Sequence, residues 1–147
     1  MRIRRLAPSD RNVYLEMARA FYASDAVDHP IPEEFLVRTF DEMMARDTYA
    51  EGYLFEESGA ALGYALLAKT WSQEAGGMAV WVEELYLRPE SRGKGVGTAF
   101  FAYLREHCPA ARYRLETEEE NVRAKALYAR MGFEPLRYES MILDLQG

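Results

Sequence analysis

The chain has 147 residues, of which 49% are hydrophobic and 29% are charged, and its net charge is −6. This length and composition are those of an ordinary globular protein, so we expect residues 1–147 to form a single domain. The acidic balance argues against a nucleic-acid partner, because nucleic acids favour basic surfaces.

Neither a membrane segment nor a disulfide is indicated. No apolar run approaches the roughly 20 residues that span a bilayer. The charged N-terminal segment lacks the apolar stretch of a signal peptide, so we expect none. The single cysteine, Cys108, excludes an intramolecular disulfide and is typical of a reducing compartment. We therefore expect a cytoplasmic protein without a membrane partner.

The first half of the chain predicts a strand, two helices and a hairpin. Alternating side chains indicate the strands, and apolar residues at helical spacing indicate the helices. Ser9 or Asp10 is a candidate N-cap for the first helix, and Pro32 suits the first turn of the second. In chain order, the elements are a strand at Ile3–Leu6, a helix from Pro8 to Phe21, a helix from Pro32 to Arg46, and strands at Tyr49–Phe55 and Ala60–Trp71.

The second half predicts strands that alternate with helices. In chain order, the elements are a strand at Val80–Leu87, a helix at Thr98–His107, a strand at Tyr113–Thr117, a helix at Asn121–Met131 capped by Gly132, and a strand at Tyr138–Leu145. The whole order is β-α-α-β-β-β-α-β-α-β. Hairpins combined with β-α-β crossovers predict an α/β or α+β fold, with a mixed sheet that carries helices on both faces.

A basic, glycine-rich turn at residues 92–97 joins the central strand to the following helix. Glycines let the backbone approach a ligand closely, and the first N–H groups of a helix point outward at the positive end of its dipole. This combination predicts an anion site. It is not a P-loop, because Gly95 follows Lys94 where Ser or Thr is required, and it lacks the Gly-x-Gly-x-x-Gly dinucleotide spacing.

The central strand predicts a β-bulge at Glu83-Glu84. The apolar residues at positions 80 and 82 have the spacing of one strand face, and so do those at positions 85 and 87. Regular alternation would, however, put these two pairs on opposite faces of the strand. A period of two slips in this way when a strand contains one extra residue. At a bulge both carboxylates can turn toward one side. The bulge also leaves backbone N–H groups free to receive a ligand carbonyl.

Three segments between residues 80 and 133 resemble the GNAT family of N-acetyltransferases. Arg92-x-x-Gly95-x-Gly97 resembles the pyrophosphate loop by which that family binds coenzyme A. Asn121-x-x-Ala124-x-x-x-Tyr128-x-x-x-Gly132-Phe133 is similar to a family signature at every named position. Leu85-Tyr86-Leu87-Arg88-Pro89-Glu90 is similar to the strand end before the loop. The resemblance implies a mixed, mostly antiparallel central sheet flanked by helices.

The resemblance also implies acetyl-CoA as the co-substrate, bound by the strand end, the loop and the second block. The residues expected to bind it are Leu85, Tyr86, Leu87, Arg92, Gly93, Lys94, Gly95, Val96, Gly97, Thr98, Asn121 and Tyr128. Asn121 equally suits the N-cap of its helix. We expect no metal, because the acyl group can pass directly from thioester to amine.

Acetyl transfer to an amine needs a base, because a lysine-like amine with a pKa of about 10.4 is protonated near neutrality. Glu83 and Glu84 are the base candidates, acting directly or through a water, and the choice between them stays open. The alternative is that they only attract a cation or are ordinary strand carboxylates. In the family, the tyrosine at the position of Tyr128 approaches the coenzyme sulfur, so Tyr128 is the candidate acid.

The acceptor site should come from loops on the rigid scaffold, together with the paired carboxylates. The residues expected to bind the acceptor are Tyr22, Asp25, His29, Trp71, Glu83 and Glu84. We expect a primary amine on a small cationic molecule or a peptide. The alternative is a non-catalytic acyl-CoA-binding sensor or regulatory module. A homodimer is compatible with the resemblance, since the last strand could pair with another subunit.

Overall fold

The computed structural model describes residues 1–24, 27 and 29–145. Its centre is a five-stranded sheet in the order β1-β2-β3-β4-β5. The first four strands pair antiparallel, and β5 pairs parallel to β4. The strands are β1 (Arg2–Arg5), β2 (Ala50–Glu57), β3 (Ala60–Ser72), β4 (Gly77–Leu87) and β5 (Arg112–Leu115). The predicted mixed, mostly antiparallel sheet is therefore confirmed.

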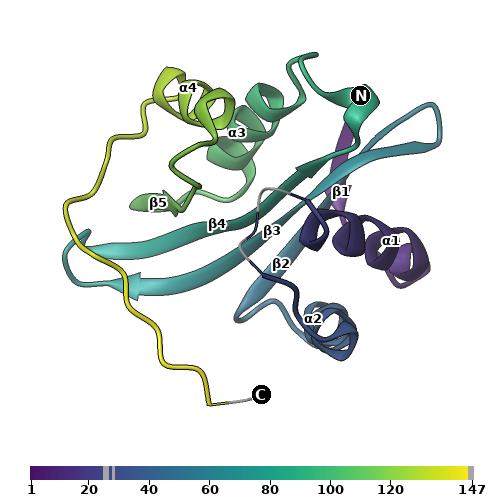
Figure 1. The fold of residues 1–147 in the computed structure, drawn as a ribbon, viewed down its shortest axis with the longest axis horizontal. Coiled ribbons are helices and arrows are strands. Elements are labelled where there is room, and N and C mark those ends of the chain that lie inside the picture. Colours follow the sequence, from purple (N-terminus) through teal and green to yellow (C-terminus); the bar gives the residue numbers. More distant parts are fainter. Residues whose placement is uncertain (25–26, 28, 146–147) are drawn as a thin grey trace.

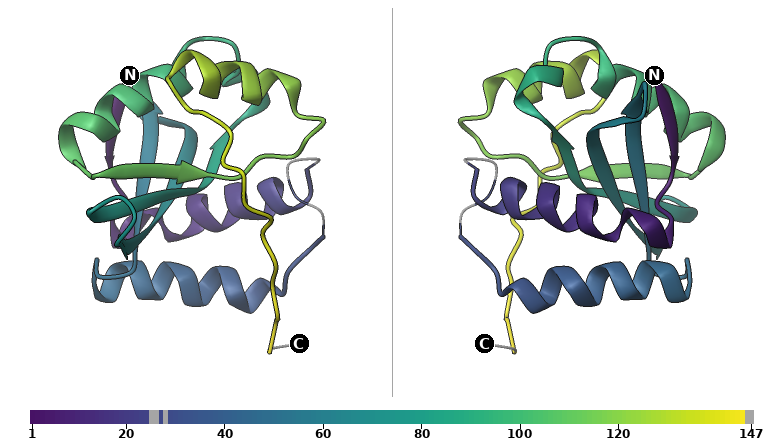
Figure 2. Two further views of the ribbon diagram at one scale, coloured as in Figure 1. Left: turned by 90° about the vertical axis from the view of Figure 1, so that its left-hand side faces the viewer. Right: turned by 90° about the vertical axis from the view of Figure 1, so that its right-hand side faces the viewer.

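Helices cover both faces of this sheet, as Figures 1 and 2 show. One layer contains the first two helices and the other contains the last two. The helices are α1 (Arg11–Tyr22), α2 (Glu33–Ala45), α3 (Val96–His107) and α4 (Val122–Arg130), with short 3-10 turns η1 (Pro8–Asp10) and η2 (Pro89–Ser91). Among the described residues, no helix is long and apolar enough to cross a membrane.

Two apolar cores separate these layers, because successive strand residues point to opposite faces of the sheet. On the α1–α2 side, Tyr14, Phe40 and Tyr64 pack in one buried cluster. On the α3–α4 side, Phe55 and Phe100 lie in the second cluster, with ring centroids 5.2 Å apart. Alternation within β3 supplies both, since Tyr64 faces the first cluster and Ala65 the second.

The last predicted strand, Tyr138–Leu145, is wrong. Residues 133–145 have no regular secondary structure, and their apolar side chains beyond Phe133 are exposed. A strand forms only when a neighbouring backbone satisfies its N–H and C=O groups. After α4, however, the chain runs away from the sheet and ends beyond the level of α2 (Figures 1 and 2). The alternation in the sequence is real, but this segment has no ladder partner within the described chain.

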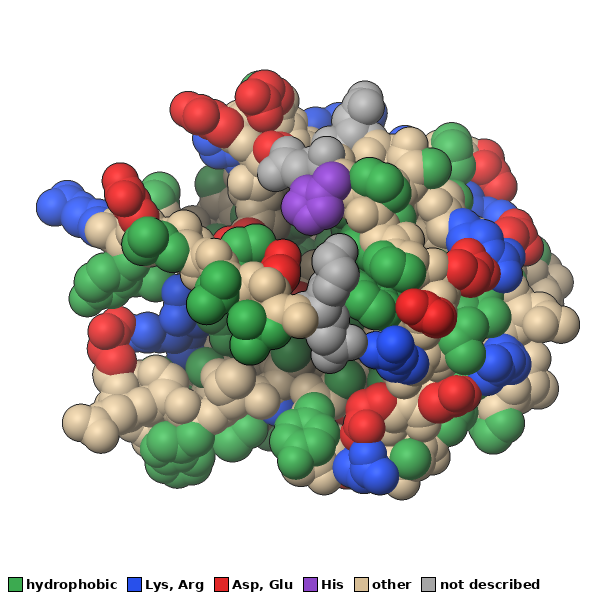
Figure 3. All heavy atoms as spheres, turned by 60° about the horizontal axis from the view of Figure 1, so that its bottom comes forward, with side chains coloured by type: hydrophobic (Ala, Val, Ile, Leu, Met, Phe, Trp, Pro, Cys, Tyr) green, Lys and Arg blue, Asp and Glu red, His purple; other side chains and the backbone are tan. Residues whose placement is uncertain are grey.

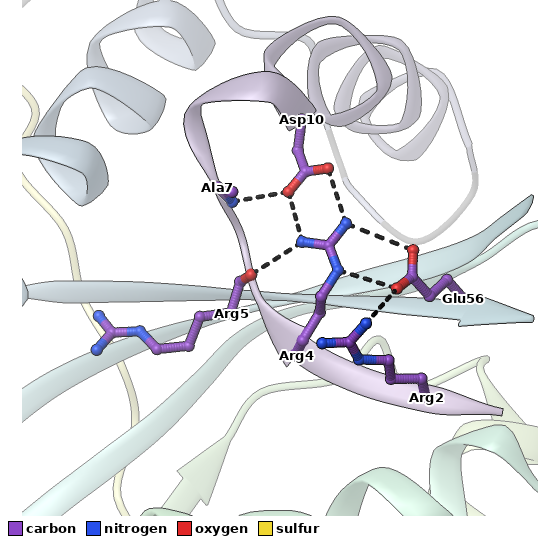
Figure 4. A network of polar contacts seen from close by, with 6 residues as sticks. All are labelled: Arg2, Arg4, Arg5, Ala7, Asp10 and Glu56. Atoms are coloured by element: carbon purple, nitrogen blue, oxygen red, sulfur yellow. Dashed lines mark hydrogen bonds and ion pairs between the residues drawn. The ribbon is translucent and has the colours of Figure 1, made fainter. Parts of the chain in front are cut away.

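A partly buried ion-pair network fastens the start of the chain to the sheet (Figure 4). The guanidinium of Arg4 donates two hydrogen bonds to Asp10, at 2.8 and 3.0 Å, and two to Glu56, at 3.0 and 3.4 Å. Asp10 also accepts the backbone N–H of Ala7 at 2.7 Å. Asp10 holds the N-cap position of α1, but its carboxylate makes no capping bond there. The pKa of Asp10 lies below its ordinary value, mainly because of the hydrogen bonds from Arg4.

Replacing Arg4 by Met should lower the free energy of unfolding by about 2 kcal/mol, because the buried Asp10 would lose its charged partner and Glu56 would keep only the longer contact with Arg2, at 3.8 Å. The control is Arg5→Met, since Arg5 is half exposed and its contact with Asp47 is 3.4 Å long. We expect that control to change stability by less than about 1 kcal/mol. Urea denaturation measures both.

The pH dependence of the same pair of proteins is a second readout. A carboxylate with a depressed pKa stabilises the fold above its unfolded pKa of about 3.9 and loses that contribution as the pH falls through its folded value. The stability gap between the native chain and Arg4→Met should therefore shrink below about pH 4. A gap that is small at pH 7, or that widens in acid, would contradict this role for Arg4.

Candidate functional site

The two central strands of the sheet separate at the predicted bulge. Along β3 and β4, Leu67 pairs with Val82 and Leu66 pairs with Glu84, which leaves Glu83 as the extra residue. On the other side of β4, pairing with β5 covers only residues 79–82. From Glu83 to Leu87 the β5-facing edge of β4 is therefore open in the described structure. Its backbone groups are available to a ligand.

Beyond this open edge, a glycine turn leads into the N-terminus of α3. Gly93 and Gly95 have φ values of 74° and 81°, which favour glycine. Gly95 is the N-cap of α3, and the first bond of the helix runs from Ala99 N–H to the Gly95 carbonyl at 3.0 Å. The amides of residues 96–98 precede that bond and have no intrahelical acceptor. The backbone and the helix dipole therefore form a candidate anion site at the predicted position.

A cleft of about 1060 Å³ runs along these two features. It contains most of the residues that the sequence predicts to bind a cofactor. Those lining it are Leu85, Tyr86, Leu87, Arg92, Gly93, Gly95, Val96, Gly97, Thr98 and Asn121. Arg92 also donates from Nε to the Leu87 carbonyl at 3.0 Å, so its side chain fastens the turn to the strand end. Lys94 is exposed and does not line the cleft.

Helix α4 supplies the opposite wall and two cations that the sequence analysis missed. Arg123 and Arg130 line the cleft, and Leu127 lies between them on the same face. The spacing of four residues from Arg123 to Leu127 and of three from Leu127 to Arg130 indicates one helix face, and this signal could have identified the two arginines. A Cβ on Gly97 would lie 2.9 Å from Leu127, so the glycine allows α3 and α4 to approach closely. Asn121 caps α4, since its Oδ1 accepts the Ala124 N–H at 3.3 Å.

Glu84 lies buried on the α1–α2 side of β4 and is held by two phenols. Tyr22 donates a hydrogen bond to Oε2 at 2.5 Å, and Tyr64 donates one to Oε1 at 2.6 Å. Burial raises the pKa of Glu84, and the two hydrogen bonds oppose this shift. Because both oxygens already accept hydrogen bonds, Glu84 is well suited to position Tyr22 and less suited to take a proton from a ligand.

Glu83 differs from its neighbour in exposure. It is the extra residue of the bulge, and its side chain is open to solvent. Partial desolvation, and then the nearby carboxylates of Glu84 and Glu116, raise the pKa of Glu83. A carboxylate of raised pKa that a ligand can reach is a stronger base than an ordinary surface glutamate. The bulge therefore brings both predicted carboxylates together but gives them different environments.

Tyr128 lies on α4 but is not among the residues that line the cleft. Its ring packs edge-on against Phe101 and Phe133, with centroids 5.9 and 6.0 Å away. Burial raises the pKa of Tyr128, so its phenol stays protonated at neutral pH. Tyr128 can therefore donate a hydrogen bond to a developing anion.

The remaining predicted acceptor residues are dispersed. Tyr22 is at the site through its bond to Glu84. His29 is exposed on the segment between α1 and α2, and Asp25 falls outside the described residues. Trp71 is 72% exposed near the β3–β4 turn, where it pairs with Met78. It lies about 13 Å along β3 from Leu67, next to the bulge. The structure does not place Trp71 with the paired carboxylates.

Taken together, the open edge of β4 has the candidate anion site at one end and the solvent-accessible carboxylate of Glu83 at the other. Such a cleft can hold the anionic end of an extended ligand at the helix N-terminus, with the middle of the ligand along the strand backbone. The other end of the ligand then lies beside a base. In the part of the chain that the structure describes, no group of three or more His, Cys, Asp or Glu side chains is arranged to hold a metal ion.

Several solved structures share this fold. A possible acetyltransferase from Clostridium difficile 630 has a TM-score of 0.83 at 18% identity, over 99% of this chain and 98% of that one. A predicted acetyltransferase from Clostridium acetobutylicum, solved with acetyl-CoA, has a TM-score of 0.77 at 18% identity, over 98% and 96%. AAC(6')-Iy, in complex with the bisubstrate analogue CoA-S-monomethyl-acetylneamine, has a TM-score of 0.78 at 15% identity, over 97% of both chains.

No curated protein matches this chain in sequence. The family comparison does match, however. The model described as the acetyltransferase (GNAT) family covers residues 13–133, which include the bulge, the glycine turn and α4. This match extends over well more than half of the chain, and the protein therefore belongs to the acetyltransferase (GNAT) family.

Proposed function

We propose that this protein is an acetyl-CoA-dependent N-acetyltransferase that acts on the primary amine of a small cationic molecule or a peptide. One observation carries the proposal. The β5-facing edge of β4 is open from the bulge at Glu83 to Leu87, and the glycine turn continues directly from it. This arrangement supports a site in which the acyl donor and the base lie along a single stretch of backbone.

Acetyl-CoA would lie with its pyrophosphate at the N-terminus of α3 and its pantetheine arm along residues 85–87. The amides of residues 96–98 and the helix dipole favour the phosphates, and Arg123 and Arg130 add full positive charge to the cleft wall. Gly93 and Gly95 keep side chains away from this approach. The anionic end of the coenzyme thus meets cations and dipoles while its thioester points toward the bulge.

Glu83 is the residue that we assign as base, acting directly or through a water. It is solvent-accessible and its pKa is raised, whereas both oxygens of Glu84 accept hydrogen bonds from tyrosines. Deprotonation of the ammonium lets its nitrogen attack the thioester carbonyl, which gives a tetrahedral intermediate. Collapse of this intermediate breaks the C–S bond and forms the amide. Glu84 holds Tyr22 at the acceptor side.

Tyr128 is the residue that we assign to the departing thiolate. A phenol of raised pKa is a weaker acid than the thiol that forms, with a reference pKa of about 8.5, so complete proton transfer from Tyr128 is uphill. A hydrogen bond from the phenol to the sulfur lowers the cost of the developing charge without that transfer.

The electrostatics of the acceptor side support a cationic amine. Glu84 and Glu116 lie near enough to Glu83 for their charges to raise its pKa. A bound ammonium relieves this mutual repulsion. The AAC(6')-Iy neighbour, whose bisubstrate analogue joins coenzyme A to acetylneamine, shows that this fold accommodates an amine-rich acceptor in that protein. We also propose that the protein is cytoplasmic and homodimeric.

The direct test measures thiol release from acetyl-CoA with a panel of polyamines, aminoglycosides, amino acids, peptide N-termini and lysine peptides. Release with one cationic class, and little with neutral amines of similar size, is the expected result. Tight acetyl-CoA binding with no release for any class would instead favour a sensor module. Absence of both release and binding would contradict the proposed cleft.

Replacing Glu83 by Gln should reduce kcat/KM by about 10²-fold or more, because the glutamine cannot accept the proton. In the native enzyme, activity should fall as the pH drops through the pKa of Glu83, which lies above the ordinary glutamate value of about 4.3. Glu83→Gln should lose that limb of the pH profile. Glu84→Gln is the comparison, and it should keep the limb while raising KM for the amine.

The Tyr128→Phe variant should lower kcat by about 10²-fold while acetyl-CoA affinity stays nearly unchanged, because only the hydrogen bond to the leaving sulfur is removed. Tyr113→Phe is the matched control. Its phenol donates to the Cys108 carbonyl at 2.8 Å in the same half of the molecule. An equal loss of kcat in both variants would assign Tyr128 a packing role only. Single-turnover measurements ensure that the chemical step is observed.

Replacing Gly95 by Val should weaken coenzyme A binding by about tenfold or more, because a β-branched residue disfavours the φ of 81° and covers the turn amides. Gly59→Val is a close control. Gly59 has a φ of 80°, and a Cβ at either glycine meets nothing within 4 Å. Isothermal titration should show normal coenzyme A affinity for Gly59→Val. Equal affinity in both variants would place the phosphates elsewhere.

A further inference from the structure

A guanidinium on β5 lies over an indole on β4, on the α1–α2 side of the sheet. Val80 and Val82 belong to the core on the other side, so Trp81 between them faces the α1–α2 side. Trp81 pairs with Arg114 in the parallel register, and the Arg114 Cζ atom lies 4.2 Å from the centroid of the Trp81 ring. The left part of this face is hollowed, and Lys or Arg side chains lie in the hollow (Figure 3). Both members of the pair are partly exposed, so a ligand can reach them.

The guanidinium of Arg114 has no carboxylate partner in the described part of the chain. It forms no ion pair and no hydrogen bond there, and its contact with Trp81 is a cation–π contact. Arg112, two residues earlier on β5, is by contrast paired with Glu74 at 2.9 Å. A planar guanidinium that lies over a ring keeps its five N–H donors for a second partner, and a carboxylate can accept two of them in parallel. Arg114 is therefore held in place and able to bind an anion.

This cation lies close to the two exposed carboxylates of the acceptor side. Glu83 follows Trp81 by two residues on β4, which is about 7 Å along an extended strand. Glu116 follows Arg114 by two residues, just after β5 ends, and its charge contributes to the raised pKa of Glu83. The acceptor side therefore combines an anionic end and a cationic end within the span of one small molecule.

The coenzyme does not account for this cation. Arg123 and Arg130 line the cleft that leads to the N-terminus of α3, whereas Arg114 is not part of its lining. The candidate anion site also lies at the opposite end of the open β4 edge from Glu83. Arg114 borders a different hollow, a groove of about 1010 Å³ between α3, β5 and α4. Its donors are therefore left for a ligand group other than the pyrophosphate.

We propose that Arg114, held by Trp81, binds a carboxylate of the acceptor, so that the acceptor is a zwitterionic amine such as an amino acid or a short peptide. This inference rests on the proposed acetyl transfer and narrows its acceptor. The ammonium lies at Glu83 and Glu116, and the carboxylate lies at Arg114. Glu83 takes one proton from the ammonium, the freed nitrogen attacks the thioester, and the acceptor carboxylate stays ionised throughout. A polyamine would instead bring a second cation against Arg114, which opposes its binding.

The first experiment measures acceptor binding without turnover. The chain has two tryptophans, so Trp71→Phe leaves Trp81 as the only one, and Trp71 is exposed enough to tolerate the change. Protein saturated with coenzyme A is titrated with glycine, γ-aminobutyrate, lysine and glycylglycine, each beside its carboxamide. At least one acid should change the Trp81 fluorescence saturably, with an affinity about tenfold or more above that of its amide. Equal responses to acid and amide, or no response to any acid, would overturn the proposal.

The second experiment uses the acid that binds, and its amide, as acceptors in steady-state acetyl transfer. Arg114→Gln should raise KM for the acid by about tenfold or more while kcat changes far less, because the lost contact is remote from the reacting atoms. KM for the amide should stay unchanged. Arg112→Gln is the matched control, since Arg112 lies on the same strand and is committed to Glu74. This control should leave both KM values unchanged, and circular dichroism checks the fold of each variant.

Arg114→Lys should recover only part of the affinity that Arg114→Gln loses, because the charge remains but the planar fork is lost. An equal loss for acid and amide, or an equal loss in Arg112→Gln, would overturn the proposal and assign Arg114 a structural role. Acetyl transfer without preference for a carboxylate would overturn this inference and leave the proposed function intact. Carboxylate-selective binding at Trp81 with no transfer to any amine would support Arg114 and contradict the proposed function.

Discussion

The incomplete pairing of β4 is the constraint on which the rest of this structure depends. β3 accompanies β4 along its length, whereas β5 accompanies it for only four residues and then diverges at the bulge. Backbone groups that a continuous sheet would bury in hydrogen bonds are thereby left to a ligand. The glycine turn and the N-terminus of α3 follow in the same direction. The single interruption of the β4–β5 ladder thus opens the cleft, and it sets the direction in which the cleft runs, from the bulge toward the N-terminus of α3.

The bulge also gives two adjacent glutamates different chemistry. An uninterrupted strand would send Glu83 and Glu84 to opposite faces of the sheet. Here Glu84 is buried and hydrogen-bonded to Tyr22 and Tyr64, whereas Glu83 stays reachable and its pKa is raised by desolvation and neighbouring carboxylates. In the proposed mechanism, Glu84 positions Tyr22 and Glu83 takes the proton. Environment, and not residue type, separates their roles.

The same interruption leaves the β5 half of the molecule less complete than the β1 half. At the β1 end, Arg4 joins β1, η1 and β2 through short ion pairs that are largely sealed from water. At the β5 end, the described residues leave an unpaired strand edge, an apolar groove and exposed apolar side chains along residues 138–145. Free strand edges and exposed apolar surface are both costly in water.

The sequence by itself determined the fold class, the glycine turn, the bulge and the family signature, because each depends on local spacing or backbone freedom. It could not decide which glutamate is reachable, since that depends on Tyr22 and Tyr64, which are far from β4 in the chain. It missed Arg123 and Arg130, which face the cleft only once α4 is docked. It also predicted a strand at Tyr138–Leu145. Alternation shows that a segment can pair, but only tertiary structure supplies or withholds the partner.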